Sequence, residues 1–193
     1  MADHDFRILV VCTANICRSV MAERFLRRDL ERLAPPWTVE VLSAGFLTEG
    51  EPASSTVIEV LDERGLDARD HRSRRVDETL LESADLVVTM ERRHARELAL
   101  LGERGSTHIH TLGALTAWLA DAPDGGRGDP GATVAACAAA RPPAGLLGSG
   151  TDEVEDPHGR AKRVLRRSAA RLELLSDRLV RGLFGPPGTH RNP

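Results

Sequence analysis

The stretch that decides the fold runs from Phe6 to Ser19 and reads FRILVVCTANICRS. Its first part, Phe6 to Val11, is a short apolar, β-branched run bounded by charged residues, which is typical of a strand buried on both faces of a parallel sheet. A tight loop follows, and from Ser19 to Leu33 apolar residues recur at helical spacing, which predicts a helix. The opening of the chain therefore predicts a strand, a loop and a helix.

The same alternation continues along the chain. Trp37 to Leu42 alternates as a strand does, and Ser54 to Arg64 is predicted to be a helix closed by Gly65. The later predicted elements are a strand at Leu86 to Met90, a helix-prone stretch at Glu91 to Leu101, a strand at Thr107 to Leu112 and a long amphipathic helix at Ala161 to Leu183. Such alternation predicts an α/β fold with a doubly wound parallel sheet.

One domain is expected over residues 1–184, because 193 residues match the usual size of a single α/β domain. A segment rich in Gly, Pro and Ala, about 120–150, is interpreted as an insertion that holds a short helix from Ala132 to Ala140. Residues 185–193 are expected to form a loose tail.

Composition restricts the class of partner. Twenty-six Lys and Arg stand against 29 Asp and Glu, and a net charge of -3 gives no general attraction to nucleic acid or to anionic membranes. The early apolar run from Ile8 to Val11 is far shorter than the roughly 20 residues that span a bilayer. Three cysteines do not form a secreted disulfide framework. We therefore expect a cytoplasmic protein without nucleic-acid binding or membrane insertion.

The loop after the first strand has the residues of an anion site. Cys12 would face the N-terminus of the following helix and the guanidinium of Arg18, which together favour thiolate and lower a thiol pKa from about 8.5 by several units. Arg18 can bracket two phosphoryl oxygens, and Asn15 tolerates the left-handed backbone that turns N–H groups inward. An arbitrary Cys and Arg at this spacing are more often structural, but the strand-to-helix turn favours a nucleophile.

The segment resembles the signature loop of the low-molecular-weight protein tyrosine phosphatases, Cys-x-x-Asn-x-Cys-Arg-Ser at the end of the first strand. Further similar motifs follow in the same order: Ser43-Ala44-Gly45, His71 before an Arg-rich stretch, Leu86 to Glu91, and Glu155-Asp156-Pro157 before the last helix. The resemblance implies a four-stranded parallel sheet flanked by helices in three layers. It also implies two-step hydrolysis of tyrosine-phosphorylated proteins through a phosphocysteine, with no metal and no cofactor.

The resemblance also assigns roles to residues. Cys12 would be the nucleophile, Arg18 the phosphate ligand and Asp156 the general acid and base. Ser19 would assist the sulfur, although it could simply cap the helix, and Asn15, Ser43 and His71 would fix the loop. Cys17 is a candidate for reversible disulfide formation with Cys12. The substrate-binding loop would comprise Thr13, Ala14, Asn15, Ile16, Cys17, Arg18 and Ser19.

The sequence departs from the family pattern near the acid. His158-Gly159 replaces the aromatic pair that often follows Asp-Pro, and the 120–150 insertion lies directly before this loop, where it would add a rim to the pocket. A second Asp-Pro pair begins at Asp129, and with no helix expected directly after it a plain turn is predicted. Cys137 is expected to be a buried helix residue.

Phosphotyrosine hydrolysis is the favoured function, and three alternatives stay open. A thiol-dependent arsenate reductase would need further resolving cysteines, and only Cys137 lies outside the loop. An arginine phosphatase on the same scaffold would be expected to carry Thr where Ile16 stands. A non-catalytic phosphate-binding regulatory module would have no need of both Cys12 and Asp156.

A cluster of arginines follows His71 and comprises Arg72, Arg74 and Arg75. It would either steer acidic phosphopeptides toward the pocket or simply form a solvated surface.

Overall fold

The computed structural model describes residues 5–47, 49–103, 105–122, 129–142, 146 and 150–185. Four strands form one parallel sheet in the order β2-β1-β3-β4, as predicted. They are β1 (Phe6–Cys12), β2 (Val39–Gly45), β3 (Leu86–Thr89) and β4 (Ile109–Thr111). The chain leaves β1 on one side to reach β2 and returns on the other to β3. Ligands of such sheets bind outside the carboxyl end of the central strands, and Cys12 is the last residue of β1.

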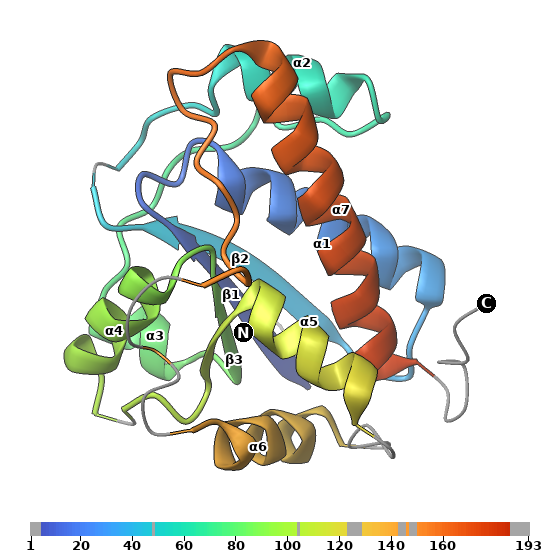
Figure 1. Cartoon of the computed structure of the whole chain (residues 1–193). Coiled ribbons are helices and arrows are strands. Elements are labelled where there is room, and N and C mark those ends of the chain that lie inside the picture. Colours follow the sequence, from blue (N-terminus) through green and yellow to red (C-terminus); the bar gives the residue numbers. More distant parts are fainter. Residues whose placement is uncertain are drawn as a thin grey trace.

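Helices cover both faces of the sheet (Figure 1). One face carries α1 (Arg18–Leu33), α5 (Leu112–Asp121) and α7 (Lys162–Phe184), with α2 (Ser55–Asp62) beside the upper part of α7. The other face carries α3 (Glu78–Glu82) and α4 (Arg92–Leu101). The three layers confirm the predicted doubly wound α/β fold.

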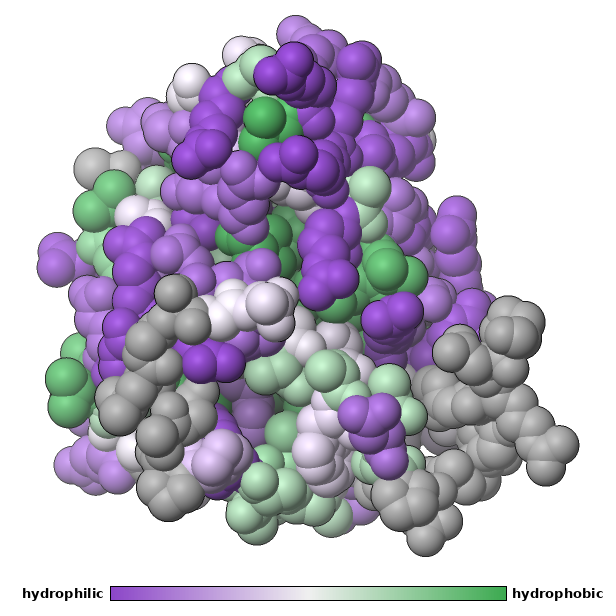
Figure 2. Space-filling model, in the orientation of Figure 1, coloured by the Kyte–Doolittle hydropathy of each residue, from purple (hydrophilic) through white to green (hydrophobic). Residues whose placement is uncertain are grey.

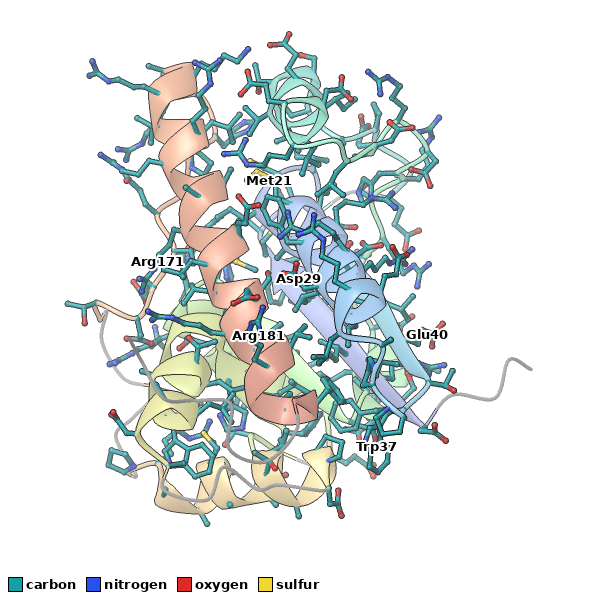
Figure 3. The ribbon with its side chains drawn as sticks, turned by 90° about the vertical axis from the view of Figure 1, so that its right-hand side faces the viewer. Met21, Asp29, Trp37, Glu40, Arg171 and Arg181 are labelled. Carbon is teal, nitrogen blue, oxygen red and sulfur yellow. The ribbon has the colours of Figure 1, made fainter. Side chains whose placement is uncertain are left out.

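Alternate side chains of β1 supply the two halves of the core. Phe6, Ile8 and Val10 pack toward α1 and α7, whereas Leu9 and Val11 pack toward α3 and α4. All five are buried, as expected for a strand that is covered on both faces of the sheet. Figure 3 shows α7 alongside α1, with the fully buried Met21 in the seam between them. This packing fixes the start of α1 against the end of β1.

The chain after β4 contains more helix than the sequence predicted, both before and within the insertion. α5 begins at Leu112, where the predicted strand was to end, and α6 (Pro130–Ala140) begins two residues before the expected Ala132. Asp129 is therefore not a plain turn residue: it is the N-cap of α6, and its carboxylate accepts from the N–H groups of Gly131 and Ala132. An Asp N-cap followed by Pro at the first helical position satisfies a helix start.

The insertion packs against the edge of the sheet. Arg141, directly after α6, donates to the carbonyl oxygen of Ile109 on the edge strand β4 at 2.7 Å. The outer surface over α6 is pale green in Figure 2, in agreement with its exposed alanines. Covering an edge strand in this way prevents its unpaired groups from recruiting another chain. The parts of the predicted insertion and tail at 123–128, 143–145, 147–149 and 186–193 lie outside the described residues.

No helix in the described part of the chain combines the length and the apolar character needed to cross a membrane.

Candidate active site

The loop from Thr13 to Cys17 turns its carbonyl groups outward. The Thr13 carbonyl accepts from the N–H of Phe46 at 2.8 Å, and the Ile16 carbonyl accepts from the N–H of Ser54 at 3.0 Å. The Asn15 carbonyl lies 2.7 Å from Nε2 of His71. Among the described residues, no group accepts from the N–H groups of residues 13–17. A loop held by its carbonyls leaves these N–H groups for an anion.

Helix α1 begins at this loop without a side-chain cap. Its N-cap is Cys17, which makes no capping hydrogen bond, and its first turn contains no acidic residue. Ser19, considered from sequence as a possible cap, is in the first turn of the helix, and its hydroxyl oxygen lies 3.0 Å from Sγ of Cys12. The free N–H groups and the positive end of the helix dipole therefore face the sulfur.

Asn15 ties the loop to three other segments. Its backbone is left-handed, with φ of 54°, as its residue type suggested. Its buried amide donates to the hydroxyl groups of Ser19 at 2.9 Å and of Ser43 at 2.8 Å, while its side-chain oxygen accepts from the N–H of Arg74. With His71 on its carbonyl, the structure brings the predicted set of Asn15, Ser43 and His71 together.

Two further residues of this network, Glu23 and Gly45, were assigned no role from the sequence. Ser43 donates to Oε2 of Glu23 at 2.5 Å, so a buried carboxylate of α1 fixes the serine that holds Asn15. Position 45 requires glycine because the backbone of the phosphate loop passes close to it: a Cβ at Gly45 would stand 2.7 Å from the backbone nitrogen of Asn15. The Ser-Ala-Gly motif at the end of β2 thus supports the loop through a hydroxyl group and through the absence of a side chain.

Arg18 is buried, with 1% of its surface exposed, and its guanidinium spans the pocket floor. Nη1 donates to Oε1 of Glu91 at 2.6 Å and to the carbonyl of Val154. Nη2 donates to Oδ2 of Asp156 at 2.8 Å and to the hydroxyl oxygen of Thr13 at 3.3 Å. Within the described chain no acceptor is bonded to Nε. The structure therefore places the predicted arginine and the predicted acid in direct contact.

Glu91 holds Arg18 and was not predicted as a site residue. Burial alone would raise the pKa of its carboxyl group, but hydrogen bonds from Arg93 and Arg18 outweigh burial and lower the pKa to about 2. The group is therefore a permanent anion at neutral pH. An uncompensated buried guanidinium would be costly, and removing one partner of such a pair typically costs about 3–5 kcal/mol.

Thr13 has three polar neighbours. Its hydroxyl oxygen accepts from Nη2 of Arg18 at 3.3 Å and from Nη2 of Arg93 at 3.1 Å, and Nε2 of His94 lies 3.1 Å away. Two arginine donors occupy both lone pairs of the oxygen, so the hydroxyl proton points to His94. Burial lowers the pKa of His94 to about 4, which leaves its ring neutral and able to accept this proton.

The pocket in front of Cys12 has a volume of about 270 Å³ and mixed walls. Ile16 and Leu47 give the pocket apolar surface, and 55% of Leu47 is exposed. Leu47 belongs to no motif that the sequence predicted. Asp156 and His158 add polar groups to the lining. The lining includes no described residue of the 120–150 insertion, so the expected rim from that segment is wrong for its described part. Its helix α6 packs near α5 and α7 instead.

Asp156 and Asp129 differ in position. The side chain of Asp156 is 42% exposed at the pocket, whereas Asp129 caps α6 away from it.

The three cysteines are unpaired and buried. Cys17 lines the pocket, and burial together with the nearby Cys12 raises its thiol pKa to about 12. Cys137 lies in α6, as expected, where burial raises its thiol pKa to about 11.

Within the described ranges, no three His, Cys, Asp or Glu side chains are grouped so that they could hold a metal ion.

Known proteins share this sequence pattern and geometry. Residues 7–127 match the family described as low molecular weight phosphotyrosine protein phosphatase. The probable low molecular weight protein-tyrosine-phosphatase EpsP of Ralstonia solanacearum is 34% identical over 117 residues, which cover 60% of this chain and 77% of EpsP. Wzb of Escherichia coli K12, a low molecular weight protein-tyrosine-phosphatase, is 42% identical over 91 residues, covering 47% of this chain and 58% of Wzb.

Solved structures extend the likeness over nearly the whole fold. The low molecular weight protein tyrosine phosphatase of T. tengcongensis superposes with a TM-score of 0.69 at 31% identity, covering 91% of this chain and 98% of that one. The YwlE arginine phosphatase of Geobacillus stearothermophilus gives 0.67 at 30% identity, with 90% of each chain covered. This chain therefore belongs to the low molecular weight phosphotyrosine protein phosphatase family and is a phosphoric monoester hydrolase.

Proposed function

We propose that the chain is a protein tyrosine phosphatase that hydrolyses phosphotyrosine through a phosphocysteine on Cys12. The observation that carries this proposal is the position of Sγ of Cys12 at the uncapped start of α1, inside a loop whose carbonyl groups face outward. Backbone N–H groups and a helix dipole stabilise both a sulfur anion and a bound phosphate at that point. Arg18 completes the site with a guanidinium on its floor.

In the first step the Cys12 thiolate attacks phosphorus, an S–P bond forms and the P–O bond to the phenol breaks. Asp156, in its protonated form, gives its proton to the leaving oxygen, so that a neutral phenol departs. The loop N–H groups and Arg18 bind the three equatorial oxygens, over which the charge spreads. Each role needs a group at the pocket, and both Asp156 and Arg18 line it.

Substrate must displace Asp156 from Arg18 before this step. In the structure Oδ2 of Asp156 accepts from Nη2 of Arg18, while Nε of Arg18 bonds to no described acceptor. A phosphate dianion can take Nε and the N–H that Asp156 releases, which gives the bidentate geometry that arginine favours. Release also brings the carboxyl group toward the leaving oxygen at the rim, where 42% of its side chain is already exposed.

In the second step water attacks the phosphocysteine, the S–P bond breaks and inorganic phosphate leaves. Asp156, now a carboxylate, accepts the proton of the attacking water. The Ser19 hydroxyl donates to the departing sulfur at 3.0 Å, an orientation supported by the Asn15 amide, which donates to the same hydroxyl oxygen. Glu91, Thr13 and His94 keep the guanidinium oriented throughout both steps.

Phosphotyrosine is preferred to phosphoarginine because Ile16 and Leu47 offer apolar surface to an aromatic ring. Hydrolysis of phosphoarginine is the runner-up, favoured by the similarity to the YwlE arginine phosphatase. The test compares phosphotyrosine, phosphoarginine and phosphoserine peptides of one sequence, with a metal chelator present, and adds arsenate with thioredoxin. The highest kcat/KM is expected for phosphotyrosine, and a clear preference for phosphoarginine or arsenate would reassign the function.

Two finer assignments belong to the same proposal. Cys17 serves as the partner for a Cys12 that peroxide has oxidised to sulfenic acid, because both residues line the same pocket: the Cys17 sulfur attacks the Cys12 sulfur, an S–S bond forms, and the S–O bond breaks with loss of water. A cytoplasmic location suits a reactive thiol that must stay reduced. The substrates in this proposal are tyrosine-phosphorylated proteins. Peptide mapping after mild peroxide treatment would detect a Cys12–Cys17 disulfide, and an irreversibly oxidised Cys12 beside a free Cys17 would contradict this role.

A further inference from the structure

A second polar cavity of about 170 Å³ lies behind the phosphate loop. Helix α1 contributes Arg24 and Arg27 to its wall, and the segment after His71 contributes Arg72 and Arg74. We call this cavity the basic cleft. Cys12, Arg18 and Asp156 do not line it, so it is distinct from the catalytic pocket.

The basic cleft has an excess of positive charge. Its four guanidinium groups face two carboxylates, those of Glu23 and Asp70, which leaves a net charge of +2. Both carboxylates are already paired: Arg24 with Asp70 at 2.7 Å and Arg27 with Glu23 at 2.8 Å. The excess therefore resides on the other two arginines.

Arg72 and Arg74 have no carboxylate partner within the described chain. Arg72 donates only to the carbonyls of Arg69 and His71, and the Arg74 guanidinium makes no hydrogen bond there. Nε of Arg24 is in addition buried without an acceptor among the described residues. A buried donor without a partner costs free energy, and a cluster of guanidinium groups with spare donors favours an oxyanion.

The walls of the basic cleft include residues that hold the phosphate loop. Ser43 and His71 line it, and each makes a hydrogen bond to Asn15. The segment that carries Arg72 and Arg74 also supplies the Arg74 N–H that binds the Asn15 side chain. An anion bridging this segment and α1 would oppose the mutual repulsion of the guanidinium groups and so stabilise the loop.

We propose that the basic cleft binds a small phosphate-bearing anion, and that its occupant stabilises the phosphate loop from behind. Free inorganic phosphate, which is the product of the reaction, and a small phosphate monoester share the chemistry that the cleft recognises. Arg72 and Arg74 are exposed to solvent, so the affinity should fall as ionic strength rises.

The test counts phosphate sites by calorimetric titration of the full chain. The starting protein is the Cys12→Ala variant, which cannot form a phosphocysteine, so the outcome does not depend on phosphotyrosine hydrolysis. Two sites for inorganic phosphate are expected in this variant. One site is expected after Arg72→Ala and Arg74→Ala are added, and one after Arg18→Ala is added instead, because each change removes a different site.

Arg75→Ala in the Cys12→Ala background is the matched control, since Arg75 is a neighbouring exposed arginine outside the cleft. It should keep both sites. Glycerol 3-phosphate, titrated in parallel, distinguishes the sources: binding weaker by tenfold or more than that of inorganic phosphate identifies the free product as the ligand, and tighter binding identifies a monoester.

Thermal unfolding supplies a second readout. Phosphate should raise the melting temperature of the Cys12→Ala, Arg18→Ala protein more than sodium chloride of equal ionic strength does, and this rise should vanish with Arg72→Ala alone, a milder change that retains Arg74. A single site in Cys12→Ala that Arg72→Ala and Arg74→Ala leave unchanged would overturn the proposal. Equal stabilisation by phosphate and by chloride would do so as well.

Discussion

Two of the buried cysteines, Cys12 and Cys137, each lie beside a polar side chain, yet their surroundings predict opposite chemistry. Sγ of Cys12 is 3.0 Å from the Ser19 hydroxyl at the uncapped start of α1, in a pocket floored by Arg18. Cys137 lies in α6 with its Sγ 3.6 Å from Nδ1 of His110 on β4, and burial raises the pKa of the Cys137 thiol to about 11. The comparison teaches that helix position and nearby charge, more than burial, make a thiol a nucleophile.

The largest expected effect tests this contrast directly. Cys12→Ser should lower the turnover of p-nitrophenyl phosphate by about a thousandfold or more, because the nucleophile is lost. Cys137→Ser, the matched control, should leave turnover within about twofold. Steady-state kinetics at one pH provide the measurement, and comparable losses in both variants would show that the environment of the thiol does not decide reactivity.

The two Asp-Pro pairs provide the next contrast. Asp156→Ala should slow hydrolysis of phenyl phosphate, whose leaving group needs a proton, by roughly a hundredfold or more, since general acid catalysis is commonly worth about 10²–10⁴. Asp129→Ala should instead cost about 1 kcal/mol of stability, because it removes the N-cap of α6, and leave kcat nearly unchanged. Kinetics and urea unfolding of both variants separate the roles. If Asp129→Ala lost activity as strongly, the acid would have to be reassigned.

A smaller effect is expected from the support behind Arg18. His94→Leu should lower kcat/KM about tenfold, since the Thr13 hydroxyl would lose its acceptor, whereas His94→Gln keeps an acceptor near the Nε2 position and should recover most of the activity. In a Thr13→Val background, His94→Leu should have little further effect. Additive losses in this double-mutant cycle would show that His94 acts by another route.

The smallest effect concerns stability at acid pH. Burial lowers the pKa values of His94 and His110 to about 4. Between about pH 6.5 and pH 4 these two side chains are therefore protonated in the unfolded chain but largely neutral in the folded chain. The free energy of unfolding should therefore fall as the pH drops from about 6.5 to about 4. Glu91, with its pKa lowered to about 2, adds a further loss below about 4.5. Urea unfolding at pH 7 and pH 5 should show that the free energy of unfolding falls less in the His110→Gln variant than in the unmodified chain.

Periodicity predicted most of the fold because the strands and long helices carry strong apolar patterns. β1 and α1 begin and end within one residue of the positions expected from Phe6 to Leu33. Helix α5 was missed because its sequence, LGALTAWLAD, has almost no polar stripe and starts directly after β4, so it looked like the end of a strand. Local pattern cannot mark a helix that is mostly apolar around its circumference.

The site was predicted only where its residues are close in sequence or belong to a motif. Cys12, Arg18 and Asp156 meet as expected, but Glu91, His94 and Leu47 were not identified. Glu91 reaches Arg18 across 73 positions, and its contribution depends on a tertiary contact that no spacing reveals. Leu47 lies in the loop after β2, where the sequence shows no motif, and only the folded structure brings it to the pocket.

In the proposed mechanism Cys12 carries the phosphoryl group between the two steps. The most direct measurement is rapid quenching of the Asp156→Ala variant with p-nitrophenyl phosphate, whose activated leaving group needs little protonation, followed by peptide mass spectrometry. A phosphoryl group on the peptide that contains Cys12, and none on the peptide that contains Cys137, is the predicted result. An unmodified Cys12 under conditions of continuing turnover, or phosphate on any other residue, would contradict the mechanism.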